Sequence, residues 1–342
     1  MAAATEAAVS ISRPPTRREK FCDLGFRGLT YAVAGLTVVL VLYIVATIGR
    51  AAAPAIRQRG LSFLTETAWD PNKDQYGILP QVWGTLYSSV LAVVIGTVLG
   101  VAVAVFLSER LLSLFVFRLL RLFGLPSHGF WGKLPDGLES LLKNLIELLA
   151  AIPSVVYGLW GIFVLIPLIR PACNWIHQTL GWVPLFKTAL SGPGMLPAAI
   201  VLAIMILPTI SAISRDALVS VPPKLREAAY GLGATRWEAL LSVILPTAQT
   251  GIFGAVLLAF GRALGETMAL AMLVGSANVI SWSLFSPANT LAALLASAFA
   301  DANADQVGVL MYAALVLMGI TLLVNIFGAL ILQRASRGMK GA

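Results

Sequence analysis

Two charged residues, Arg262 and Glu266, stand within an otherwise apolar stretch of this sequence and could do chemistry there. A guanidinium presents a planar fork of N–H groups that fits two oxygens of a phosphate or a carboxylate. A spacing of four residues predicts that both side chains lie on one face of a helix. The position of Arg262 within the apolar stretch places it near mid-membrane. Because a charge at the centre of a bilayer costs about 2.5–3.5 kcal/mol on insertion scales, both side chains should face a protein interior or an aqueous path. The pair is therefore a candidate anion site.

A structural role for the same residues remains open. Arg262 and Glu266 could form an ion pair that pins helices together, and Gly261 and Gly265 have the G-x-x-x-G spacing that allows two helices to approach closely. In the anion-site interpretation, Glu266 holds Arg262 while the path is empty. Arg before Glu is the weaker order for stabilising a single helix, which favours the anion site slightly.

The composition predicts the kind of helices that must position Arg262 and Glu266. The chain has 342 residues, of which 58% are hydrophobic and 12% charged, and its mean hydropathy is +0.86. A soluble domain would carry about 25% charged residues, so the sequence predicts an all-α membrane protein with several helices long enough to cross about 30 Å of hydrocarbon. Six uninterrupted apolar stretches are expected to span the membrane, at 28–49, 82–107, 144–169, 195–216, 247–275 and 306–332.

The distribution of basic residues predicts the orientation of these spans. With the N-terminus placed inside, 17 of the 24 Lys and Arg residues fall on the inner side and six on the outer side, while Arg262 lies within the fifth span. The excess of positive charge on the inner side predicts that both termini are cytoplasmic. The first span is too long for the apolar part of a signal peptide and is expected to be an uncleaved anchor. Cys22 and Cys173 would then lie on opposite sides and could not pair.

Other chemistry has little support in the sequence. The only two histidines, His128 and His177, are also expected on opposite sides, and no Cys or carboxylate cluster has metal-ligand spacing. No acid, base and nucleophile cluster together, which argues against an enzyme. There is no G-x-x-x-x-G-K-[ST] loop, so any ATP coupling must come from another subunit. We expect no metal and no cofactor in this chain.

The segment 220–246, between the fourth and fifth spans, contains two helix starts. Pro222 and Pro223 suit the opening turn of the first helix, and Thr235 and Glu238 have capping-box spacing for a second. Glycines between them allow a sharp turn. We therefore expect two short helices joined by a tight bend on the cytoplasmic side.

This segment resembles the EAA loop of ABC importer permeases, whose pattern is E-A-A-x3-G-x9-I-x-L-P. Val243 replaces the Ile of the pattern. The resemblance implies that the segment docks as a coupling helix on a cytoplasmic ATPase. The matching residues are Glu227, Ala228, Ala229, Gly233, Leu245 and Pro246.

A more specific resemblance covers about residues 82–332. The runs 152–161 (IPSVVYGLWG), 261–267 (GRALGET) and 280–287 (ISWSLFSP) are similar to those of PstC-type permease subunits of the bacterial phosphate importer. In that family the membrane Arg and Glu are associated with phosphate passage, and this role carries over to Arg262 and Glu266. Ser154, Tyr157 and Thr267 are further candidates for the path.

The inner segment 108–143 is longer than the resemblance leads us to expect. Residues 111–125 are strongly apolar, carry Arg118 and Arg121, and could form a helix at the membrane interface.

The sequence thus predicts the six-helix fold of type I ABC importer permeases. The resemblance implies a transport subunit for phosphate that pairs with a PstA-like permease, with two PstB-like ATPase subunits that bind ATP and Mg, and with a PstS-like binding protein outside. Rival interpretations are an ABC permease for another oxyanion and an ATP-independent secondary transporter. The expected parts are an N-terminal tail (1–27), an anchor helix (28–49), a periplasmic loop (50–81), a permease domain (82–332) with its insertion and coupling loop, and a C-terminal tail (333–342).

Overall fold

A computed structural model describes residues 16–109, 111–122 and 130–340 of the chain. These residues fall into two units, Met1–Ala51 and Ala52–Ala342, which we describe separately. The described part of the first unit is one long helix, the larger part of α1 (Arg17–Arg59). Its apolar side chains are largely exposed, as expected for an anchor that contacts lipid.

Six helices of the described chain are long and apolar enough to cross a membrane, which confirms the expected number of spans. Two of these spans, 154–180 and 236–264, each consist of several consecutive helical elements, and the span 304–334 is part of one longer helix. The elements of the six spans are α1, α3 (Leu79–Ser108), α6 (Ser154–Trp160) with η2 (Gly161–Leu165) and α7 (Ile166–Leu180), α8 (Met195–Val219), α10 (Arg236–Ala239) with η4 (Leu240–Ile244) and α11 (Leu245–Leu264), and most of α14 (Ala304–Lys340).

Two expected spans have wrong boundaries. The third was expected at 144–169, but a helix ends at Leu149 and the next begins at Ser154. Pro153 causes this break, since it has no N–H to donate and lies in an extended conformation, with ψ of 139°. The fifth span was expected at 247–275, but its helix runs from Arg236 to Leu264. Here the helix ends at Leu264, with Gly265 as its C-cap, and a short new helix begins at Met268.

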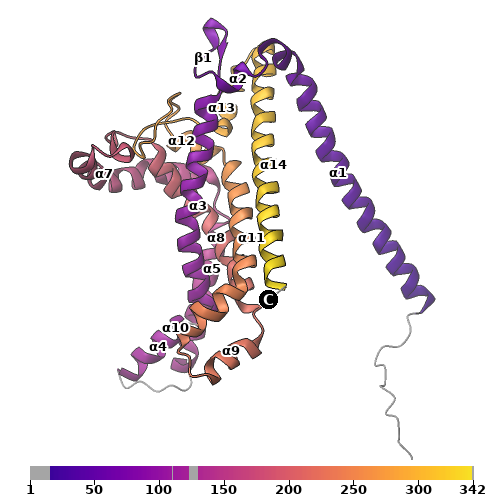
Figure 1. Cartoon of the computed structure of the whole chain (residues 1–342), viewed down its shortest axis with the longest axis vertical. Helices are drawn as coiled ribbons and strands as arrows, with labels where there is room; N and C mark the ends of the chain where they lie inside the picture. Colours follow the sequence, from indigo (N-terminus) through magenta and orange to yellow (C-terminus); the bar gives the residue numbers. More distant parts are fainter. Residues whose placement is uncertain (1–15, 110, 123–129, 341–342) are drawn as a thin grey trace, which may run out of the picture. The chain divides into compact units, whose positions relative to one another are not determined.

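The core of the second unit is the contact of α3 with α8, which run alongside each other in Figure 1. Small residues of α3 make this contact close. A Cβ added to Gly100 would lie 2.7 Å from Ile210 Cγ2, and one added to Gly96 would lie 3.0 Å from Ile206 Cγ1. Both isoleucines are fully buried. α11 packs on the same two helices, whereas α7 projects sideways from them (Figure 1).

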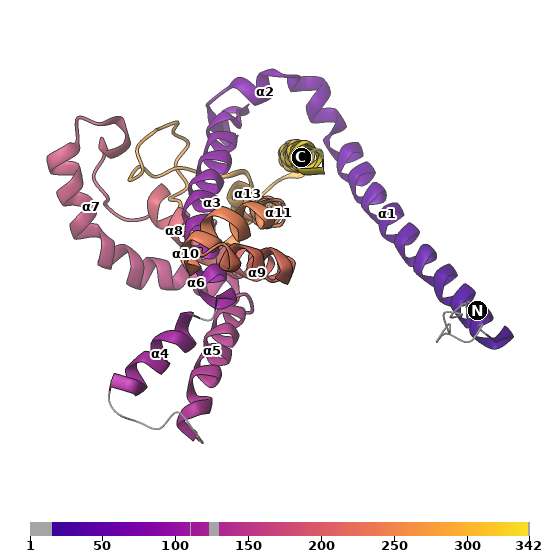
Figure 2. The ribbon, with the colours of Figure 1, turned by 60° about the horizontal axis from the view of Figure 1, so that its bottom comes forward.

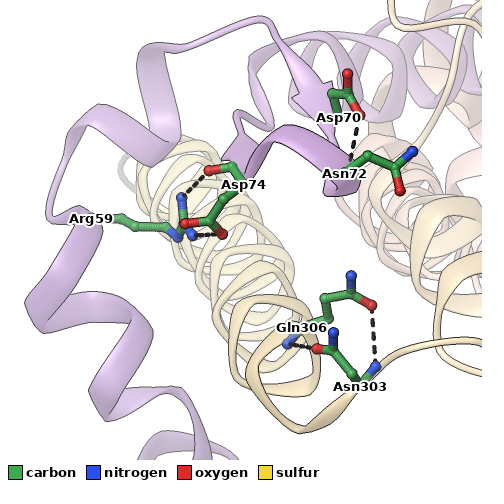
Figure 3. Close-up of polar contacts among 6 residues, drawn as sticks. All are labelled: Arg59, Asp70, Asn72, Asp74, Asn303 and Gln306. Atoms are coloured by element: carbon green, nitrogen blue, oxygen red, sulfur yellow. Dashed lines mark hydrogen bonds and ion pairs between the residues drawn. The ribbon is translucent and has the colours of Figure 1, made fainter.

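Two short strands, β1 (Trp69–Asp70) and β2 (Gln75–Tyr76), form a small cap on the second unit. The strands pair antiparallel around the turn η1 (Pro71–Lys73). Figure 3 shows Arg59 reaching Asp74, with Nη2 2.6 Å from the carboxylate oxygen Oδ1. Beneath the cap, α2 (Ser62–Thr65) contributes Phe63, which stacks on Tyr312 of α14. These contacts tie the start of α3 to α14.

The insertion forms a hairpin of two packed helices, α4 (Leu111–Leu122) and α5 (Phe130–Leu149), visible in Figure 2. Ser113 Oγ donates to Glu139 Oε2 at 2.7 Å between them. The expected helix within 111–125 is thus confirmed, and Arg118 on it is exposed. The side chain of Arg121 and the whole of His128 lie outside the described residues.

Candidate substrate path and coupling segment

The helix that carries Arg262 ends just after it. Gly265 caps α11, with its N–H bonded to Arg262 O at 3.2 Å, and Glu266 and Thr267 lie in a short break. The next helix, α12, covers only Met268–Leu273. Inside the break, Thr267 Oγ1 donates to Gly265 O at 3.1 Å. The candidate anion site is therefore built on a helix end, and Arg262 does not lie in the middle of a helix as expected.

The expected geometry of Arg262 with Glu266 is wrong for the same reason. A separation of four residues brings side chains together only on a continuous helix, and the break separates these two. Among the residues that the structure describes, no ion pair joins them. Arg262 is exposed and Glu266 is half-buried. The guanidinium is thus not neutralised by Glu266.

Arg262 instead contacts α8. Its Nη1 donates to Thr209 Oγ1 at 3.3 Å. The hydroxyl of Tyr157 on α6 donates to Leu149 O at 2.8 Å. Arg262 of α11 and the Thr209 hydroxyl of α8 therefore lie together beside the break. Sequence reasoning missed Thr209, because nothing local to it signals a partner 53 residues away.

The two glycines beside Arg262 have different roles. A Cβ on Gly261 would lie 3.3 Å from Asn325 Oδ1, so this glycine allows α11 to approach α14 closely. Gly265 has only backbone of its own turn nearby and ends the helix. The structure supports close packing at Gly261, but not at Gly265.

The run 280–287 lies in a loop between α12 and α13 (Leu291–Ala298). Side chains of α3 fasten this loop: Trp83 Nε1 donates to Ser281 O at 3.1 Å and the Tyr87 hydroxyl donates to Trp282 O at 2.8 Å. The ring of Trp282 meets Trp83 edge to face, with centroids 4.4 Å apart. The loop is therefore held in one conformation against α3.

The segment 220–246 contains the expected bend. Its first helix is α9 (Pro223–Gly231), and Gly233 takes a φ of +88° in the turn that follows. The capping box at Thr235 is complete, since Thr235 Oγ1 accepts from the Glu238 N–H at 3.3 Å and the Thr235 N–H donates to Glu238 Oε2 at 2.7 Å. The second helix, however, is not separate. It continues from Arg236 through a π-helical stretch, η4, into α11.

The residues of the EAA pattern divide into an exposed set and a packed set. Glu227 and Ala228 of α9 are exposed, whereas Ala229 is buried. Leu245 and Pro246 begin α11, directly after the π-helical stretch η4. One face of α9 is thus free, and the other is packed on the spans.

Comparison with known proteins places this architecture in a family. The family described as "Binding-protein-dependent transport system inner membrane component" matches residues 130–337. The chain is 37% identical to the phosphate transport system permease protein PstC of Mesorhizobium japonicum, over 98% of this chain and 96% of that protein. It is 36% identical to PstC of Haemophilus influenzae, over 90% of this chain and 92% of that protein.

Solved structures agree on the fold. A bacterial alginate ABC transporter in complex with its periplasmic protein superposes with a TM-score of 0.56 at 14% identity, over 90% of this chain and 95% of that one. The inward-facing methionine ABC transporter MetNI superposes with a TM-score of 0.51 at 17% identity, over 75% of this chain and 95% of that one.

The fold and the six spans define an ABC importer permease, a multi-pass inner membrane component that works with a binding protein and a separate ATPase. Within this class, the chain belongs to the PstC family of transport permeases. Such a component is a transport subunit, not an enzyme, and permeases of this kind carry no cofactor of their own. Within the described residues, no group of three or more His, Cys, Asp or Glu side chains could hold a metal ion.

Proposed function

We propose that this chain is the membrane permease of an ATP-driven phosphate importer and lines the phosphate path together with a PstA-like subunit. The observation that carries the proposal is the identity of 37% over nearly the whole length of a phosphate transport permease. The site supports it, because Arg262 offers a guanidinium that Glu266 does not neutralise.

Arg262 and Glu266 are the proposed path residues. Phosphate oxygens accept from the guanidinium fork, and the neighbouring Thr209 hydroxyl adds a donor on α8. Glu266 lies in the break, where its negative charge repels a bound anion and limits how long it stays. A site built on a helix break can also move without unwinding a helix.

The coupling segment is proposed to face the cytoplasm. The excess of Lys and Arg on the inner side favours this orientation, with both termini cytoplasmic. The exposed Glu227 and Ala228 of α9 then dock on one of two PstB-like ATPase subunits, with Gly233, Leu245 and Pro246 shaping the turn and the return into the membrane. A PstS-like protein delivers phosphate at the outer face of the bacterial plasma membrane.

Transport follows an alternating-access cycle in this proposal. Closure of the ATPase pair moves α9 together with α8, which precedes it, and α11, which follows it. This movement opens Arg262 to one side of the membrane at a time. The ATPase supplies the energy, and this chain supplies the path.

The test is uptake of labelled phosphate by vesicles that contain this chain and its proposed partners. Uptake that requires ATP inside and is not reduced by excess sulfate is the expected result. Uptake without ATP would refute the ABC mechanism in favour of a secondary transporter. Sulfate uptake in place of phosphate uptake would keep the architecture and identify another oxyanion as substrate.

A further inference from the structure

Arg226, next to the EAA pattern on α9, bonds to the end of α8, eight residues back, and to Glu109 at the end of α3, 117 residues back. Its Nη1 donates to Glu109 Oε1 at 2.7 Å, and its Nη2 donates to Leu218 O at 2.8 Å. The two charged side chains are largely shielded, with 22% of Arg226 and 13% of Glu109 exposed. A charge pair with this little solvent is screened far less than a surface pair.

Both acceptors lie at the C-terminal ends of helices, where the backbone is already negative. Glu109 is the C-cap of α3, and Leu218 belongs to the last turn of α8. The last carbonyls of a helix have no partner within it, and a carboxylate there is unfavourable with respect to the helix dipole. Without Arg226, the Glu109 charge and these carbonyls would repel one another. The guanidinium therefore holds two helix ends together at α9.

An apolar cluster joins the two helix ends that Arg226 binds. Buried residues of α3, α8, the segment after α8, the π-helical stretch η4 and the start of α11 pack together; they are Ala104, Leu218, Val221, Leu240, Ile244 and Ala248. Figure 2 shows α9 beside α10, at the start of the span Arg236–Leu264, which carries Arg262. α9 thus contacts the start of this span, and Arg226 binds the ends of α3 and α8 directly.

We propose that Arg226 and Glu109 form a clamp that transmits the movement of α9 to α3 and α8. The inference rests on the proposed function, because it assigns the clamp to the coupling of ATP hydrolysis to phosphate transport. Arg226 is a positioning residue: it contacts neither phosphate nor ATP. It acts through α8, which carries Thr209, the partner of Arg262. Arg226 directly precedes the exposed Glu227, so a displacement of α9 by the ATPase reaches the end of α3 through the Arg226 side chain. It reaches α8 through the short connecting segment and the bond to Leu218 O.

A merely structural role makes a different prediction. If the pair only stabilised the fold, its loss would reduce uptake and ATP hydrolysis together, through loss of folded complex. If it is a clamp, the complex still assembles and hydrolyses ATP, but less phosphate moves for each ATP. The ratio of phosphate transported to ATP hydrolysed therefore separates the two roles.

The experiment uses the complete complex in proteoliposomes, with phosphate uptake and ATP hydrolysis measured on the same preparation. Arg226→Ala and Glu109→Ala should each lower the ratio about tenfold, the size expected for mutations along a coupling network. The exchange Arg226→Glu with Glu109→Arg should recover part of it, because the pair is restored in reverse, although the bond to Leu218 O is lost. Lys73→Ala, which removes the exposed pair with Asp70 in the cap, should leave the ratio unchanged.

A second measurement does not depend on the substrate. In a Cys22→Ser background, spin labels at the exposed positions Leu232, just after α9, and Val98, on α3, report the distance between these elements with and without ATP. One narrow distance distribution is expected with Arg226, and a broad one with Arg226→Ala. A narrow distribution in the variant, or an unchanged ratio, would overturn the clamp. A wild-type complex that takes up no phosphate would instead refute the proposed function, and the distance measurement would still decide on the clamp.

Discussion

Arg262 donates to Thr209 across the space between α11 and α8, over a sequence separation of 53 residues. The guanidinium lies one turn or less from the end of α11, and the hydroxyl follows Pro208 within α8. Both helices are therefore irregular next to the contact, since one ends there and the other carries a proline that cannot donate its backbone hydrogen bond. A contact between two such elements can change when either helix moves.

Removing the hydroxyl tests whether Thr209 belongs to the phosphate path. Thr209→Val keeps the shape of the side chain but deletes one donor to the anion and the partner of Arg262. A single hydrogen bond contributes about 1 kcal/mol, so the phosphate concentration for half-maximal uptake should rise about fivefold. Thr321→Val is the matched control, because Thr321 of α14 bonds only to Leu317 O of its own helix. Equal effects of the two substitutions would exclude Thr209 from the path.

Replacing Arg262 by Lys separates charge from shape. A Lys keeps the positive charge but provides a point charge in place of the planar fork. If phosphate is bound by two parallel N–H groups, Arg262→Lys should reduce uptake about tenfold or more at a fixed phosphate concentration, since hydrogen bonds to charged groups contribute about 1.5–3 kcal/mol. Arg57→Lys, at an exposed position of α1, is the control. Wild-type uptake by Arg262→Lys would show that only charge matters there.

The local features of the fold could be predicted from the sequence, and the long-range ones could not. The capping box of Thr235 with Glu238 depends on four consecutive residues, and the structure has it as predicted. The number of spans also follows from hydropathy alone. In contrast, the contact of Arg226 with Glu109 crosses 117 residues and leaves no local pattern.

The prediction that Arg262 and Glu266 share one helix face is wrong for a different reason. Helical spacing was applied across Gly265, where a residue of low helix propensity ends the helix. Gly261 and Gly265 look equivalent in the sequence, yet one packs on Asn325 and the other ends α11. Only tertiary contacts distinguish them. The helix break at 150–153, by comparison, was visible in the sequence as Pro153, and its omission made the third expected span begin too early.

The contact of α3 with α8 should not tolerate an additional methyl group. In Gly100→Ala, the new Cβ would lie 2.7 Å from Ile210 Cγ2 and 2.8 Å from Ile210 Cβ, closer than real side chains allow. Overpacking of this kind costs about 1–3 kcal/mol, so the purified protein should aggregate at a lower temperature in detergent. Gly254→Ala in α11 has open space around it and should have no such effect. If both variants behave like the wild type, α3 and α8 do not pack as closely as described.

The last residue of α9 and the turn after it offer a matched pair of glycines for testing the coupling segment. Gly231 and Gly233 both have open space for a Cβ, but only Gly233 has a positive φ, of +88°. An L-residue in that region costs about 1–2 kcal/mol, whereas Ala is favoured over Gly by about 0.5–1 kcal/mol inside a helix. Gly233→Ala should therefore lower the temperature at which ATP-driven uptake is half inactivated, and Gly231→Ala should leave it unchanged or raise it. Because neither substitution creates a clash, the difference reflects the strain at Gly233 together with the preference of Ala for the helix at position 231. A loss of the same size in both variants would mean that docking on the ATPase requires bare backbone at both positions.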